Sequence, residues 1–119
     1  MTSILVGLVA LLHLYFLYLE MFMWTKPLGM KSFGLTPQTA EQSKTLAANQ
    51  GLYNGFLAAG LIWSILDERP EVALTMRLFM LTCVIIAGIF GAYSTGNRKI
   101  LFIQSLPATV ALLSALAEV

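Results

Sequence analysis

The chemistry open to this sequence rests on a few polar side chains set among apolar residues. Glu20 lies in the run HLYFLYLEMFMW, and His13 precedes it by seven residues. Seven residues are close to two helical turns, so the two side chains fall on one face of a helix. A carboxylate in an apolar membrane helix is costly and is therefore usually paired, hydrated or functional. We predict that Glu20 is the charged or proton-accepting group of a ligand-binding site.

Four further polar side chains follow in the run ANQGLYNGF. Asn49 and Tyr53 are four residues apart, as are Gln50 and Asn54, so a helix presents them as one broad polar face. A single amide here is explained by interhelical hydrogen bonding, which contributes about 0.6 kcal/mol per bond. Four polar side chains exceed that need, so the pattern favours contact with a ligand.

Each predicted ligand-binding residue also has a simpler structural explanation. Glu20 could be an interfacial carboxylate that reaches water beside Trp24, and His13 could be a neutral residue that hydrogen-bonds between helices. Tyr93 could belong to an aromatic belt at the membrane surface. Both interpretations stay open. The complete predicted set is Glu20, Asn49, Gln50, Tyr53, Asn54, Tyr93, Gln104 and His13.

The composition places this chain in a lipid bilayer. Its 119 residues are 58% hydrophobic and 11% charged, whereas about a quarter of a soluble domain is charged. The net charge is +1 and Arg98-Lys99 is the one basic cluster, so nothing suggests nucleic-acid binding. A lone Cys83 allows no intrachain disulfide, and one histidine without a cysteine cluster predicts no metal site. No hydrolase or phosphate-binding signature is present, and enzymatic activity stays open.

Four apolar stretches approach the length of a bilayer-crossing helix, about 20 residues. They are roughly Ile4–Trp24, Leu46–Leu66, Leu74–Thr95 and Ile100–Ala117. Backbone groups in lipid must be hydrogen-bonded internally, so we predict an all-α integral membrane four-helix bundle that forms one domain over residues 1–119. Thr36-Pro37 predicts the N-cap and first residue of helix two, and Pro70 predicts the opening of helix three.

Basic residues predict the orientation of these helices. The first and third connections carry Lys26, Lys31, Lys44, Arg98 and Lys99. The other side carries Arg69 and Arg77, and the Arg77 side chain is expected to extend outward to water. The positive-inside rule then places the first and third connections in the cytoplasm and the N and C termini on the outer side.

The polar residues gather toward the cytoplasmic ends of the predicted helices. Helices rise about 1.5 Å per residue, which places Glu20 roughly 6 Å inside that end of helix one and His13 near the midplane. The outer halves are apolar, which predicts a polar pocket open to the cytoplasm and closed outside by an apolar plug. Small residues predict helix-packing stripes at Gly51, Gly55 and Ala59, and at Gly88 and Ala92.

The runs HLYFLYLEMFMWTKPLGMKSFGL and KTLAANQGLYNGFLAAGLIW resemble the domain-of-unknown-function 1304 family of small bacterial membrane proteins. The resemblance covers essentially the whole chain, and its motifs are specific. It implies a multi-pass, four-span protein of the bacterial inner membrane and supplies no established activity.

A second resemblance links ANQGLYNGFLAAGLIW and FGAYSTGNRKI to the membrane-associated eicosanoid and glutathione metabolism (MAPEG) superfamily. It implies a four-helix trimer with a glutathione or lipid site between subunits, toward the cytoplasmic end. Asn49 would match the helix-two asparagine, and Tyr93 the helix-three tyrosine near the thiol. Helix two offers only Lys44 where that superfamily has an arginine, and its acidic position falls near Tyr53-Asn54.

Three functions are compatible with these patterns. The first is an oligomeric membrane protein that binds a small amphipathic molecule in the cytoplasm-facing pocket, with membrane lipid and further copies of the chain as partners. The second is a MAPEG-like transferase that uses glutathione. The third is a small proton-coupled exporter that uses Glu20, since small four-helix multidrug exporters also carry one glutamate in helix one. One bundle of this size is too thin for a large cavity, which predicts a pocket between subunits.

Overall fold

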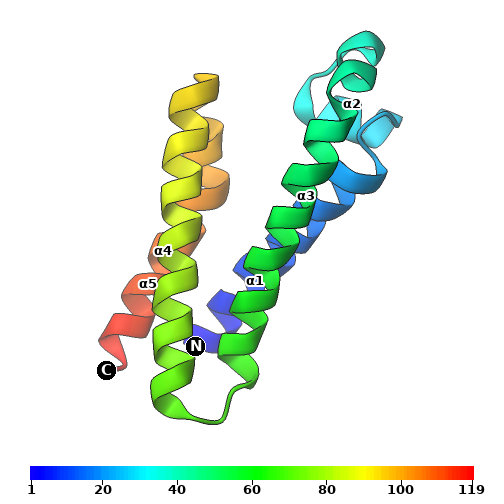
Figure 1. The fold of residues 1–119 in the computed structure, drawn as a ribbon. Helices are drawn as coiled ribbons and strands as arrows, with labels where there is room; N and C mark the ends of the chain where they lie inside the picture. The colour runs from blue at the N-terminus through cyan, green and yellow to red at the C-terminus, as the bar shows by residue number, and fades with distance from the viewer. The chain divides into compact units, whose positions relative to one another are not determined.

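Helices alone build this protein, as the sequence predicted (Figure 1). The computed structural model describes residues 1–119, which form five α-helices and one π-helical segment and no strand. These elements are α1 (Thr2–Phe22), α2 (Pro27–Phe33), α3 (Pro37–Leu66), α4 (Pro70–Thr95), η1 (Leu101–Ser105) and α5 (Leu106–Ala117). Two compact units divide the chain. The first unit comprises Met1–Ala10 and Leu57–Val119, and the second unit comprises Leu11–Phe56.

Prolines open two long helices where the sequence predicted them. Pro37 is the first residue of α3, and the Thr36 hydroxyl accepts a hydrogen bond of 3.1 Å from the Thr39 N–H. Pro70 is the first residue of α4. The connection between α1 and α3 contains the short helix α2, which was not predicted from the sequence.

The last predicted helix, residues 100–117, is not uniform. Its first part is the π-helical segment η1, in which the Leu106 N–H bonds the carbonyl of Leu101, five residues earlier. Pro107 follows directly, and a proline lacks an N–H and its ring crowds the preceding turn of an α-helix. The wider π turn accommodates that crowding before α5 continues.

Two helices are long and apolar enough to cross a membrane. They are α1 and α4, whose most apolar segments have mean hydropathies of 2.0 and 2.2. The stretch Leu101–Ala117 is a shorter apolar helix. The polar residues in the first half of α3 explain why it does not join them. The four-span arrangement is therefore supported in part.

The first unit has an apolar core to which α1, α3, α4 and α5 all contribute. Its buried members are Val6, Val9, Ala10, Leu61, Leu81, Val84, Ala108 and Ala111. These residues come from the apolar halves identified in the sequence. Val6 precedes Val9 and Ala10 by three and four residues, and Leu81 precedes Val84 by three, which is the spacing of residues on one face of a helix.

Helices α4 and α5 lie side by side in the first unit, and their approach depends on a glycine (Figure 1). A Cβ added to Gly88 would overlap the Ser105 hydroxyl and lie 3.0 Å from the Ser105 nitrogen. The Ser105 hydroxyl in turn donates to the Ile85 carbonyl at 3.0 Å. Gly88 and Ala92 are both buried, which confirms the small-residue stripe predicted for this helix.

Candidate functional site

The candidate site lies in the second unit, where α1 and α3 pack in antiparallel directions. Gly51 makes this approach possible, because an added Cβ would lie 2.6 Å from Met21 Cγ and 3.1 Å from Glu20 Cβ. A Cβ added to Gly55 would likewise lie 2.7 Å from the Leu17 Cδ1. The two glycines confirm part of the predicted packing stripe. The face of α3 that meets α1 is therefore the one that carries Gly51 and Gly55.

Glu20 and Asn54 meet between these helices. The Asn54 Nδ2 donates a hydrogen bond of 2.5 Å to the Glu20 Oε1. The two residues are 9% and 6% exposed. Neither ion pair in the structure, Lys44–Glu41 or Arg69–Asp67, involves Glu20. The carboxylate is therefore held by a neutral amide rather than by a cation.

His13 shares the buried face of α1 with Glu20, as their seven-residue spacing predicted. Its side chain is fully buried, and its ring packs edge-to-face on Phe16 with the ring centres 5.5 Å apart. His13 and Glu20, the two residues of α1 predicted to bind a ligand, are thus both buried on this face.

The four residues of the predicted polar face of α3 do not share one environment within this chain, and their role in ligand binding stays a prediction. Asn54 is buried against α1, whereas Asn49, Gln50 and Tyr53 are exposed. The Tyr53 ring lies 6.0 Å from that of Phe56 on the same helix. Residues one position apart are turned by about 100° around a helix, so the glycine face that meets α1 includes Asn54 and leaves the others on the flank.

Tyr93 and Gln104 belong to the first unit and form no part of the Glu20–Asn54 contact. Tyr93 lies near the end of α4 and is 84% exposed. Gln104 lies within η1 and is half-buried. Both remain predicted ligand contacts.

A second polar cluster, in the first unit, was not anticipated from the sequence. The Arg77 Nη2 donates to the Ser64 carbonyl at 3.2 Å and lies 3.4 Å from the Ser3 hydroxyl, so this side chain does not extend outward as expected. Ser64 lies in the last turn of α3, where a cation complements the helix dipole. The sequence signal that could have indicated this cluster is the position of Arg77 inside the apolar part of α4.

The ends of α1 and α5 also meet through polar groups. The Thr2 and Ser114 hydroxyls lie 2.6 Å apart. The hydroxyl of Thr2, and to a lesser degree its backbone N–H, hold the pKa of Glu118 below its ordinary value. These contacts lie at the same end of the first unit as the Arg77 cluster, since Thr2 and Ser3 are adjacent residues.

The turn between α3 and α4 is stabilised by Asp67. The Arg69 guanidinium donates to this carboxylate at 2.8 and 3.0 Å, and the Arg69 backbone N–H and the Trp63 indole each donate at 2.9 Å. The bonds from Arg69 and Trp63 hold the pKa of Asp67 well below its ordinary value, and the same contact raises the pKa of Arg69.

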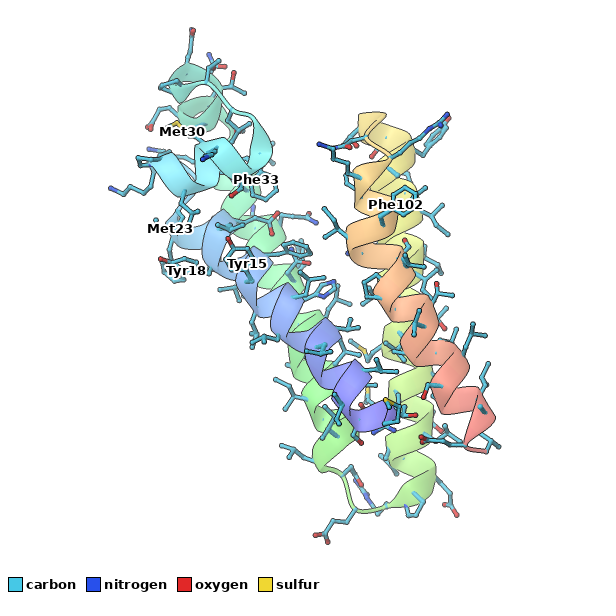
Figure 2. The ribbon with its side chains drawn as sticks, turned by 180° about the vertical axis from the view of Figure 1, so that it is seen from behind. Tyr15, Tyr18, Met23, Met30, Phe33 and Phe102 are labelled. Carbon is cyan, nitrogen blue, oxygen red and sulfur yellow. The ribbon has the colours of Figure 1, made fainter.

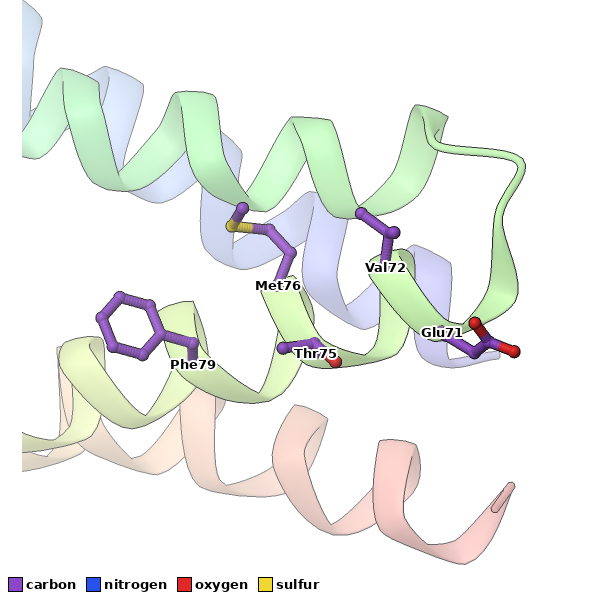
Figure 3. Close-up of a pocket in the computed structure, with 5 residues that line it drawn as sticks. All are labelled: Glu71, Val72, Thr75, Met76 and Phe79. Atoms are coloured by element: carbon purple, nitrogen blue, oxygen red, sulfur yellow. The ribbon is translucent and has the colours of Figure 1, made fainter.

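One open pocket of about 380 Å³ lies along the first turns of α4 (Figure 3). Its lining residues are Glu71, Val72, Thr75, Met76 and Phe79. None of them belongs to the predicted ligand-binding set, and four of the five side chains line it mainly with carbon. This pocket therefore does not correspond to the polar site expected from the sequence.

Comparison with known proteins identifies a family and one relative. Residues 7–116 match the family described as "Protein of unknown function (DUF1304)". The uncharacterized protein YpaA of Lactococcus lactis subsp. lactis is 34% identical over 117 residues, which cover 97% of this chain and 96% of that protein. No solved structure matches this chain. The matches do not show the MAPEG resemblance.

Proposed function

This chain belongs to the DUF1304 family, and from that premise we propose that it is an oligomeric, four-span protein of the bacterial inner membrane that binds a small amphipathic molecule. In this proposal α3 and the Leu101–Ala117 stretch are the two spans besides α1 and α4. The basic residues of the α1–α3 and α4–η1 connections would face the cytoplasm, and both termini would lie outside.

The contact between Glu20 and Asn54 is the observation that carries this proposal. A membrane helix that needs only packing has no use for a carboxylate, because burying one in an apolar span is costly. Here the carboxylate is placed at a helix–helix contact and is oriented by an amide at 2.5 Å. A ligand with a polar or cationic head would complete the set of hydrogen-bonding partners around Glu20.

The exposed amides of α3 support the oligomer. Asn49 and Gln50 lie on the flank of α3 and contact no other helix through a hydrogen bond in this chain. Amides that face lipid lose their hydrogen bonds with water, so a second copy of the chain or a ligand must cover them. Tyr53 and Asn54 would then reach the same site from the two sides of that helix.

Native mass spectrometry of gently extracted protein tests this proposal. We expect an oligomer with a co-purifying small molecule, and an Asn49→Leu/Gln50→Leu variant should shift the distribution toward monomer. Thr75→Leu, which also replaces an exposed polar residue of a long apolar helix, is the matched control and should leave the oligomer intact. A ligand-free monomer of the wild-type protein would overturn the proposal.

Proton-coupled export is the second candidate function. It is favoured by the lack of an ion pair between Glu20 and a basic residue. Glu20 lies in a helix long and apolar enough to cross a membrane, and its hydrogen-bond partner Asn54 is a neutral amide, so a proton or a cationic substrate could compensate its charge. Flux of cationic amphiphiles into liposomes under a pH gradient should be abolished by Glu20→Gln and preserved by Glu71→Gln, an exposed acid at the start of α4. Absence of flux across the panel excludes export of those compounds.

The glutathione-dependent alternative depends on Tyr93. If this exposed tyrosine activates a thiol, glutathione should raise the melting temperature of the detergent-purified protein and Tyr93→Phe should slow thiol conjugation. Tyr53→Phe, which changes an exposed tyrosine of α3, serves as the control for that assay.

A further inference from the structure

The short helix α2 is fixed against the end of α1. A Cβ added to Gly29 would overlap the Met23 carbonyl oxygen and lie 3.0 Å from the Trp24 Cα. The contact is with backbone, so no side-chain rotation could relieve it. Glycine at this position therefore lets α2 pack directly on the last residues before the turn.

An aromatic contact joins α2 to Trp24, and a hydrogen bond joins Trp24 to α3. The Trp24 and Phe33 rings lie 4.8 Å apart, and the Trp24 indole N–H donates to the Ser43 hydroxyl of α3 at 3.0 Å. Gly34, in the left-handed conformation with φ of 65°, ends the helix. Helix α2 thus packs on the Met23-Trp24 segment, which is itself bonded to α3 through Trp24.

The outer surface of α2 combines apolar and basic side chains. Leu28 and Phe33 are each 40% exposed, and Lys26 and Lys31 are exposed beside them. Figure 2 shows the Tyr15 and Tyr18 side chains on α1, that of Met23 directly after it, and those of Met30 and Phe33 on the adjoining α2. The apolar surface of a candidate membrane span therefore continues onto this helix.

Lys26, the N-cap residue of α2, and Lys31, within α2, have no acidic partner. Glu41 is the one acid between residues 21 and 50, and it is paired with Lys44. This end of the second unit therefore carries two uncompensated positive charges next to a tryptophan and exposed apolar side chains. That combination is typical of helices that lie in the headgroup layer of a membrane.

We propose that α2 is an interfacial helix that binds the headgroup of an anionic phospholipid through Lys26 and Lys31. Leu28 and Phe33 enter the upper acyl region, and Trp24 lies at the boundary. Charge complementarity selects an anionic headgroup, and the fixed docking of α2 removes the ordering cost that a flexible loop would incur. The inference requires α1 to be a membrane span but does not depend on the ligand site at Glu20.

Lipid binding to the full-length protein in detergent tests this inference. Phosphatidylglycerol adducts measured by native mass spectrometry should exceed phosphatidylcholine adducts for the wild-type chain. Two lysines at an anionic surface predict an affinity loss of about 30-fold for Lys26→Gln/Lys31→Gln. Lys44→Gln/Arg69→Gln removes the same charge from two cations that already have carboxylate partners, and it should bind as the wild type does.

Tryptophan quenching locates the helix independently of the lysine variants. In a Trp63→Phe background, Trp24 should be quenched more strongly by lipids brominated near the headgroup than by lipids brominated at the chain end. Equal phosphatidylglycerol binding by the wild type and the Lys26→Gln/Lys31→Gln variant overturns the proposal. Stronger quenching from the chain end also overturns it.

Discussion

The side-chain amide of Asn54 donates a 2.5 Å hydrogen bond to the carboxylate of Glu20, and both residues are almost fully buried between α1 and α3. Gly51 lies directly beside this bond, with no side chain to separate the helices. The pair therefore depends on the closeness of the two helices, and it in turn fixes their rotation relative to one another.

Replacing both members of this pair should reveal their coupling. In a double-mutant cycle of Glu20→Ala and Asn54→Ala, we expect a coupling free energy of about 1 kcal/mol, within the range for hydrogen bonds between membrane helices. Unfolding in mixed detergent micelles, followed by circular dichroism, measures it. The same cycle with Asn49→Ala in place of Asn54→Ala should give a value near zero, and equal coupling in both cycles would contradict the observed contact.

The contact between Gly88 and Ser105 should tolerate no added methyl group. Gly88→Ala would force α4 away from η1, which should lower the free energy of unfolding by about 1–3 kcal/mol. Ser105→Ala in the same chain should restore part of that loss, because it removes the hydroxyl nearest to the new methyl group.

A matched glycine gives the control for this prediction. Gly7 has its nearest neighbouring atom, Ile65 Cδ1, 3.8 Å from an added Cβ. Gly7→Ala should therefore be neutral or stabilising by up to about 1 kcal/mol, since alanine has the higher helix propensity. Equal losses from Gly7→Ala and Gly88→Ala would show that Ser105 is not the cause.

Docking of α2 can be tested through Trp24. Gly29→Ala places a methyl group against the Met23 backbone, so α2 should detach and the Trp24–Phe33 ring contact should be lost. In the Trp63→Phe background, the Trp24 emission should then change in wavelength and intensity. Ser32→Ala alters an exposed residue of the same helix and should leave the emission unchanged.

The Asp67 turn predicts a stability change confined to acidic solution. The folded-state pKa of Asp67 lies below its ordinary value of 3.8, so its stabilising contribution is fully present above that value and is lost as the pH falls toward the folded-state pKa. Trp63 reports on this directly, because its indole N–H bonds the carboxylate. In a Trp24→Phe background, its fluorescence should stay constant from neutrality down past the ordinary carboxyl pKa of 3.8 and should change only at lower pH, where the folded-state carboxylate is protonated.

Asp67→Asn supplies the comparison. The difference in stability between the wild type and this variant should be constant near neutral pH and should shrink as the wild-type carboxylate is protonated. A difference that grows on acidification would contradict the sign of the shift. Glu68→Gln, which alters an exposed neighbour, should titrate as the wild type does.

Several features of the fold follow from local sequence signals. Pro37 and Pro70 start their helices where they were predicted, because a proline at a helix start needs no N–H partner. Helix α2 was missed, since seven residues are too few to show a helical period and its stability comes from contacts with Trp24 and Met23. The π-helical turn before Pro107 was not predicted either, because hydrophobic periodicity does not distinguish a single π turn from an α turn.

The sequence by itself determined an all-helical chain and a shared face for His13 and Glu20, and two of its four predicted spans are helices long and apolar enough to cross a membrane. These properties depend on composition and on the helical repeat of about 3.6 residues per turn, which act over short stretches of sequence. Only the tertiary structure decided that Asn54, and not Asn49 or Gln50, meets Glu20. The rotation of α3 about its own axis made that choice, and it depends on how Gly51 fits the surface of α1, which no single helix encodes.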